Sequence, residues 1–153
     1  MTLDELIAEA AAQLDAAGVP DEALAEMRPE RRLGPVTRPA KFVPVGRAWR
    51  LGDLLVTRDG RLLATGKVVR AVVPKDFAAN KSPAEEHRRS LQRAAARGPF
   101  VAGESVNYDF APALGHTVVE QDGTVTLRLA YAEVPLETYL TDRVRFAVAP
   151  GPD

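Results

Sequence analysis

The stretch RAWRLGDLLVTRDGRLLATGKVVRAVV, residues 47–73, carries the clearest fold signal in the chain. Two runs rich in Leu and Val flank an Arg-Asp-Gly segment at residues 58–60, and a glycine in so short a loop is typical of a β-hairpin. A two-residue turn would place Arg58 opposite Arg61, and like charges in that position are unfavourable. We therefore predict a three-residue loop that pairs Thr57 with Arg61, with the loop glycine in the left-handed conformation.

This register gives the hairpin one almost wholly apolar face. Its residues are Leu54, Val56, Leu62, Ala64 and Val68. Gly52 and Gly66 then fall opposite each other on the same face, which indicates a twist or bulge, or a place where a helix, a backbone or a ligand approaches closely. Trp49 is predicted to be a core anchor with Arg70 as its cation–π neighbour.

Helices are predicted at both ends of the chain and in its middle. Thr2 and Glu5 form a capping box, and apolar residues at helical spacing continue to Gly18. Residues 21–27 suggest a short second helix. A second capping box at residues 82–85 predicts a helix that ends near Arg97.

The C-terminal stretch fits two structures. Residues 136–148 fit a helix through Leu136, Leu140 and Val144, and they also fit a strand because Val144, Phe146 and Val148 alternate with arginines. We favour the helix, with Pro135 at its first position. Residues 150–153 form a predicted tail.

A second hairpin is predicted within residues 116–134. Asp122-Gly123 is a strong signal for a two-residue turn. This turn sorts an apolar inward face from a polar outward face. The inward residues are His116, Val118, Val125, Leu127, Leu129 and Tyr131. Residues 100–110 also alternate and predict another strand, and residues 74–81 are a polar connection.

These elements predict one α+β domain over residues 1–149. We expect an antiparallel sheet built from two β-hairpins, with the N-terminal amphipathic helix, the mid-chain helix and the C-terminal helix around it. Residues 28–46 form an extended, basic, proline-rich segment of this domain.

Composition excludes several classes of function. The 153 residues are 46% hydrophobic and 27% charged with a formal net charge of −1, so the chain as a whole offers no electrostatic attraction for nucleic acid. The chain contains no cysteine, which excludes disulfides and thiolate chemistry. The acidic N-terminus lacks the features of a signal peptide and no apolar run reaches bilayer length, so we expect a cytoplasmic protein that does not enter a membrane.

Chemistry-bearing motifs are few. We find no phosphate-binding loop, dinucleotide fingerprint, zinc-protease motif or nucleophile elbow, and we predict no cofactor. The two histidines, His87 and His116, lie in different predicted elements, so no metal site is predicted. The best polar cluster consists of Glu104, Ser105, Asn107 and Asp109, with His116 as a potential general base. Ser105, Asn107 and Asp109 share one strand face, which is also typical of an ordinary solvated face.

Charge changes sign along the first fifty residues. Residues 1–27 hold seven acids and no Lys or Arg, whereas residues 28–50 hold seven basic residues and only Glu30 as an acid. The prolines of the basic segment make it a poor central strand. We favour the interpretation that it lies along the protein's own acidic N-terminal helix, and the alternative is that it tracks a phosphate backbone. The polyanion candidates are Arg31, Arg32, Arg38 and Arg47.

Two segments together carry a resemblance. PVGRAWRLGDLLVTRDGRLLATGKVVRAV (residues 44–72) followed by GPFVAGESVNYDF (residues 98–110) resembles small uncharacterised proteins of high-GC bacteria, some of which are labelled glutaminase. The resemblance implies a bacterial protein and an amide-hydrolase activity. Serine-dependent glutaminases use an S-x-x-K pair, which this chain lacks, so no catalytic residue is carried over.

We rank three functions. A non-catalytic binding or interaction module comes first, because a well-specified fold lacks a recognisable catalytic constellation. Its expected partner is another protein or a second copy of the chain, and nucleic acid is not expected. The alternatives are an amide hydrolase that uses the polar cluster at residues 104–109, and weak polyanion binding through residues 28–50.

Overall fold

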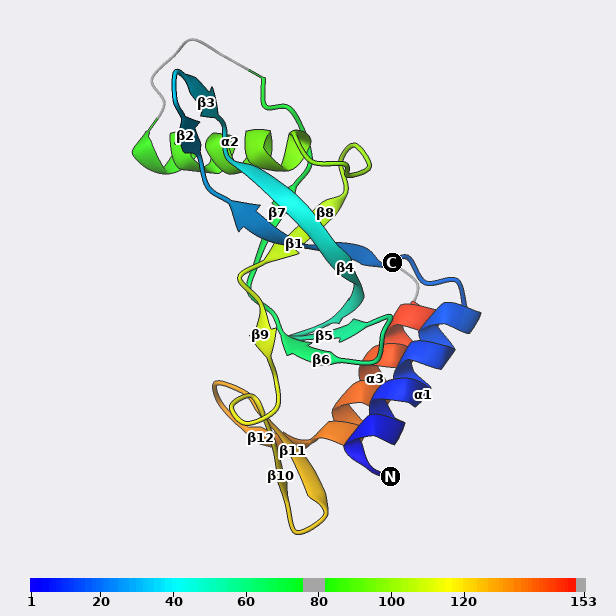
Figure 1. The fold of residues 1–153 in the computed structure, drawn as a ribbon. Helices are drawn as coiled ribbons and strands as arrows, with labels where there is room; N and C mark the ends of the chain where they lie inside the picture. The colour runs from blue at the N-terminus through cyan, green and yellow to red at the C-terminus, as the bar shows by residue number, and fades with distance from the viewer. Residues whose placement is uncertain (76–81, 151–153) are drawn as a thin grey trace. The chain divides into compact units, whose positions relative to one another are not determined.

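The computed structural model describes residues 1–75 and 82–150 (Figure 1). The chain divides into two compact units, each assembled from segments that are not consecutive. Unit 1 comprises Met1–Asp21, Arg47–Thr65 and Phe110–Asp153, and unit 2 comprises Glu22–Gly46 and Gly66–Asp109. The single domain over residues 1–149 stays a prediction.

Two helices of unit 1 lie side by side (Figure 1). Helix α1 (Leu3–Ala16) begins at Thr2, whose hydroxyl accepts a hydrogen bond from the Glu5 amide at 3.2 Å, as the capping box predicts. Helix α3 (Leu136–Val148) confirms the favoured C-terminal prediction, with Pro135 at its N-cap. The alternative strand is wrong because the buried residues recur at the four-residue spacing of a single helix face. These residues are Leu136, Leu140 and Val144.

The sheet of unit 1 is antiparallel. Its neighbouring strands are, in order, the end of β4 (Lys41–Leu51), β5 (Leu54–Thr57), β6 (Leu62–Ala64) and β9 (Ala111–Pro112). The three-residue loop between β5 and β6 is confirmed: Val56 pairs with Leu62, and Gly60 has a φ of +89°. The long hairpin through residue 73 is wrong, because Gly52 (φ +65°) lies in a two-residue turn between β4 and β5. Gly52 is therefore not paired with Gly66.

A separate three-stranded sheet completes unit 1. It orders β10 (Val118–Gln121), β11 (Thr124–Arg128) and β12 (Glu133–Pro135). The predicted two-residue turn is confirmed, with Asp122 and Gly123 both at positive φ. His116 and Tyr131 are exposed rather than inward, because both lie outside the strands, His116 before β10 and Tyr131 in the turn after β11.

Trp49 anchors the hydrophobic core of unit 1. Its ring is 2% exposed, and its indole Nε1 donates to the carbonyl of Val19 at 2.8 Å. The predicted cation–π contact exists with a different partner: the Arg58 guanidinium carbon, not Arg70, lies 4.4 Å from the ring centroid. Apolar side chains from α1, α3 and both sheets of unit 1 form the rest of this core. Its largest fully buried members are Leu14, Leu54, Val56, Val118, Leu127 and Leu136.

The sheet of unit 2 is mixed. It orders β7 (Lys67–Arg70), β8 (Ser105–Tyr108), β1 (Glu22–Arg28) and the start of β4, and β1 runs parallel to β8. The α+β class with three helices is therefore confirmed, whereas an antiparallel sheet made only of two hairpins is wrong. The short helix predicted at residues 21–27 is also wrong, because consecutive residues 23–25 are all buried, which a strand covered on both faces requires.

Helix α2 (Pro83–Ala96) covers the core of unit 2. The Ser82 hydroxyl caps it by accepting from the Glu85 amide at 3.2 Å, as predicted. Only Ala94 and Ala95 of the helix are buried, next to a core that includes the Phe42–Tyr108 pair. Most of the predicted connection at residues 74–81, and the predicted tail after residue 150, lie outside the described residues.

The proline-rich segment is more regular than predicted. Residues 41–51 form one strand, β4, although Pro44 lies within it. The strand accommodates the proline where the chain is exposed, between the buried residues Phe42 and Ala48. Before β4, β2 (Arg31–Leu33) and β3 (Val36–Arg38) form a two-stranded sheet of their own.

Candidate polyanion-binding surface

The β2–β3 pair is a tight hairpin rather than an extended arm. Its strands pair Arg31 with Arg38, Arg32 with Thr37 and Leu33 with Val36. The two turn residues are Gly34, at a φ of +62°, and Pro35, whose ring holds φ negative. Glycine with positive φ at the first central position is typical of a type II′ hairpin turn.

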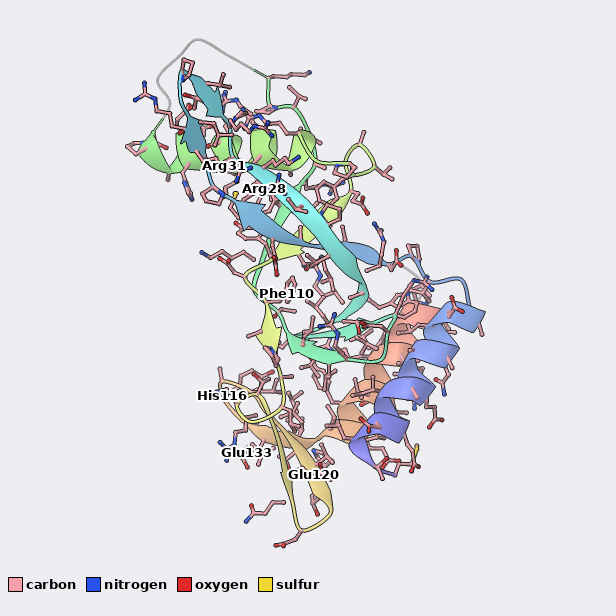
Figure 2. The ribbon with its side chains drawn as sticks, in the orientation of Figure 1. Arg28, Arg31, Phe110, His116, Glu120 and Glu133 are labelled. Atoms are coloured by element: carbon pink, nitrogen blue, oxygen red, sulfur yellow. The ribbon has the colours of Figure 1, made fainter. Side chains whose placement is uncertain are left out.

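No side chain of this hairpin is buried. Every residue from 28 to 39 is exposed, and we call these residues the arginine hairpin. Figure 2 labels two of its members, Arg28 and Arg31. A two-stranded hairpin that packs against nothing is only marginally stable in water. Burial in a core therefore does not account for the amino-acid composition of this hairpin.

The four arginines of the hairpin have no ion-pair partner in the part of the chain that the structure describes. Arg31 and Arg38 are a directly opposed pair of like charges, which destabilises a ladder. Arg28, Arg31, Arg32 and Arg38 form no ion pair within residues 1–75 and 82–150. A surface depression of about 340 Å³, lined by Glu30, Arg31, Arg32 and Thr37, lies on the hairpin.

The net charge of the chain conceals opposite charges on its units. Unit 2 holds 13 Lys and Arg against 8 Asp and Glu, a formal charge of +5. Unit 1 holds 7 Lys and Arg against 13 Asp and Glu, a formal charge of −6. Each unit therefore has a field that the total of −1 does not reveal.

Arg47, predicted as a polyanion candidate, is occupied within unit 1. Its Nη2 lies 2.9 Å from the Asp21 carboxylate. The other oxygen of that carboxylate accepts from Arg58 at 2.5 Å, and Arg58 also reaches Asp15 at 2.8 Å. Burial favours the neutral form of Asp21, but the hydrogen bonds from Arg58 and Arg47 outweigh it and lower the pKa below its ordinary value. Arg47 and Arg58 therefore connect Asp21, which follows α1, to the β4–β5–β6 sheet through ion pairs.

Other arginines of unit 1 also have acidic partners. The pairs are Arg61 with Asp59 at 3.2 Å, Arg128 with Glu133 at 3.3 Å, and Arg145 with Asp142 at 3.8 Å. All three arginines are largely exposed, so the pairs contribute little to stability. They differ from the four arginines of the hairpin in forming an ion pair among the described residues.

The predicted polar cluster has other tasks in the fold. The Glu104 carboxylate accepts from the Val101 amide at 3.0 Å. Asp109, at a φ of +55°, lies 3.5 Å from Lys67 on the exposed edge of unit 2. His116 belongs to unit 1, where it is exposed in the turn before β10 (Figure 2).

Asn107 is the buried member of that cluster. It is 1% exposed, and its Nδ2 donates to the Glu22 carboxylate at 3.1 Å and to the Ala23 carbonyl at 3.2 Å. The solvated face predicted for Ser105, Asn107 and Asp109 is therefore wrong at its centre, where the Asn107 amide is buried and bonded to β1. Asn107 joins β8 to β1 across the parallel ladder.

The apolar end of the arginine hairpin was missed at the sequence level. RRLGPVTR, residues 31–38, contains a signal for it: a Gly-Pro turn between Leu33 and Val36, with arginines on either side. The four prolines and the high charge of the longer segment, residues 28–50, favoured an extended chain instead. Among the described residues, no group of three or more acidic or histidine side chains is arranged to hold a metal ion.

Comparison with other proteins gives no family for this chain. No described helix combines the length and the apolar character needed to cross a membrane. The chain matches no protein-family model, no curated protein and no solved structure at significant similarity.

Proposed function

We propose that this protein is a non-catalytic binding module whose unit 2 binds a polyanion through the arginine hairpin. The observation that carries the proposal is the set of four exposed arginines without an ion pair among the described residues, on a unit of formal charge +5. A row of phosphates supplies partners for these four arginines, and it relieves the repulsion between Arg31 and Arg38.

The type of side chain supports phosphate as the bound group. Arginine presents a planar fork of N–H donors that binds phosphate oxygens through two hydrogen bonds. All four cations of the hairpin are arginines, and none is a lysine. Recognition of this kind involves charge and hydrogen bonding and needs no catalytic group.

The amide-hydrolase alternative has weaker support. This activity requires Glu104, Asp109 and His116 to come together in one pocket, where one of them would act on the substrate. Glu104 accepts a backbone hydrogen bond, Asp109 pairs with Lys67, and His116 belongs to unit 1.

The homodimer expected from the sequence also stays a prediction.

Binding of a fluorescein-labelled duplex, measured by anisotropy as salt rises from about 50 to 200 mM, tests the proposal. The charge variant carries Arg31→Gln, Arg32→Gln and Arg38→Gln. If each arginine neutralises one phosphate, the slope of log affinity against log salt should become shallower by about 3.

A matched variant controls for net charge. Arg61→Gln, Arg128→Gln and Arg145→Gln remove the same number of positive charges from exposed positions of unit 1. This control should keep the affinity and the salt slope of the unmodified protein. Equal binding by the charge variant and the control, or an affinity that does not change with salt, would show that the arginine hairpin is not the binding surface.

A further inference from the structure

The end of the arginine hairpin is apolar and exposed to solvent. Leu33 is 47% exposed and Val36 is 57% exposed, and the two residues face each other as the last pair before the turn. Pro35 adds a third apolar group within the turn itself. We call Leu33, Pro35 and Val36 the tip.

The two hydrophobic cores of the described residues do not account for the composition of the tip. Neither Leu33 nor Val36 belongs to either hydrophobic core. An exposed hairpin turn is ordinarily polar, because apolar side chains there gain nothing from burial. Here the apolar residues lie at the turn end of the strands that carry Arg31, Arg32 and Arg38, so a partner that attracts the arginines brings the tip against its own surface.

Resting on the proposed function, we propose that the arginine hairpin enters the minor groove of double-stranded DNA and that its tip inserts at a base step and kinks the duplex. Proteins that bind the minor groove combine arginines on the backbone and groove floor with apolar wedges of Leu, Ile, Met, Phe or Pro. The hairpin contains both components within eight residues, 31–38.

The dimensions of the hairpin favour a deformed groove. Each strand has three residues, so it extends about 10 Å. Its strands lie about 4.8 Å apart before side chains are added, whereas the undistorted minor groove is about 6 Å wide. Entry therefore requires a wider groove, which a kink toward the major groove provides. The A-form minor groove of duplex RNA is already wide and shallow, so entry there requires no kink.

Resonance energy transfer between dyes at the two ends of a DNA duplex measures the kink, and anisotropy on the same sample measures binding. The tip variant carries Leu33→Ser and Val36→Ser, which keep every charge. Because both positions are exposed, its thermal unfolding should match that of the unmodified protein. The unmodified protein should raise the transfer efficiency to the level of a bend of about 20–90°.

The tip variant should still bind the duplex with an unchanged salt slope, but the increase in transfer efficiency should be lost. The charge variant should lose binding and bending together. A protein that binds in a salt-dependent manner without bending DNA, or a tip variant that bends it equally, overturns the wedge and leaves the proposed function intact. Equal binding of duplex RNA, or equal competition by poly-glutamate, overturns DNA as the partner. A protein that binds none of these polyanions overturns the proposed function itself.

Discussion

Gly52 lies where a helix and a turn of unit 1 come closest. With a φ of +65°, it occupies the turn between β4 and β5, and the Tyr139 hydroxyl of α3 lies against its α-carbon. A β-carbon added at this position would collide with that hydroxyl and would lie 3.1 Å from the guanidinium carbon of Arg143. Gly52→Ala should therefore disturb both the turn and the contact between α3 and the sheet.

The expected loss of stability has two parts. A non-glycine residue in the left-handed region costs about 1–2 kcal/mol. The Tyr139 hydroxyl accepts from the Asp53 amide at 3.0 Å and donates to the Leu51 carbonyl at 3.3 Å, and displacing it forfeits two hydrogen bonds worth about 0.5–1.5 kcal/mol each. We expect Gly52→Ala to lower the free energy of unfolding by about 2–5 kcal/mol.

Gly60→Ala is the matched control. Its φ is +89°, yet no atom lies within 4 Å of the added β-carbon, so only the conformational cost of about 1–2 kcal/mol applies. Urea unfolding followed by the fluorescence of Trp49, the chain's only tryptophan, reports on this core. Combining Gly52→Ala with Tyr139→Phe should cost less than the sum of the two single changes, because both changes remove the hydrogen bonds of the same hydroxyl. If Gly52→Ala costs no more than Gly60→Ala, the close contact with Tyr139 is not part of the folded protein.

Three further changes test other parts of the structure. Because the pKa of Asp21 is lowered in the folded state, its stabilising effect is present above about pH 3.9 and is lost as pH falls through the folded pKa, so Asp21→Asn should flatten the acid limb of the stability–pH curve measured by urea unfolding. Asn107→Asp places a carboxylate beside Glu22 and should destabilise the protein increasingly as pH rises from 4 to 7, measured by thermal unfolding, with Asn107→Ser as the uncharged control. Phe42→Ala empties a fully buried site in unit 2 and should cost about 3–5 kcal/mol, measured by hydrogen exchange of β8 amides; protection equal to that of the unmodified protein would contradict the packing.

Features determined by neighbouring residues could be predicted from the sequence. The loop at residues 58–60 follows from the repulsion that a shorter turn would create between Arg58 and Arg61. The caps at Thr2 and Ser82 follow from side chains that reach amides three residues away. Each of these features depends on interactions within a few residues of the chain.

Features that depend on distant segments could not be predicted. Residues 23–25 are consecutive buried residues of β1, a strand that pairs in parallel with β8, far along the chain. Asn107 of β8 is likewise buried within a sheet, although the sequence predicted that it lies on a solvated face. At residue 52, a glycine turn and a glycine in a longer strand have the same local sequence, and only contact with Tyr139 distinguishes them.

Alternation of the chain between the units explains why the charge of the whole chain describes neither unit. The basic segment and the acidic N-terminus nearly cancel when they are added along the chain, but residues 1–21 belong to unit 1 and residues 22–46 to unit 2. At physiological ionic strength, interactions between exposed charges are screened beyond about 8 Å. A polyanion at the arginine hairpin therefore responds to the local cluster of arginines rather than to the chain's total of −1. Arg47, Arg58 and Arg128 each have a carboxylate partner, whereas the four arginines of the hairpin form no ion pair among the described residues, and for this reason we expect the hairpin to attract phosphates.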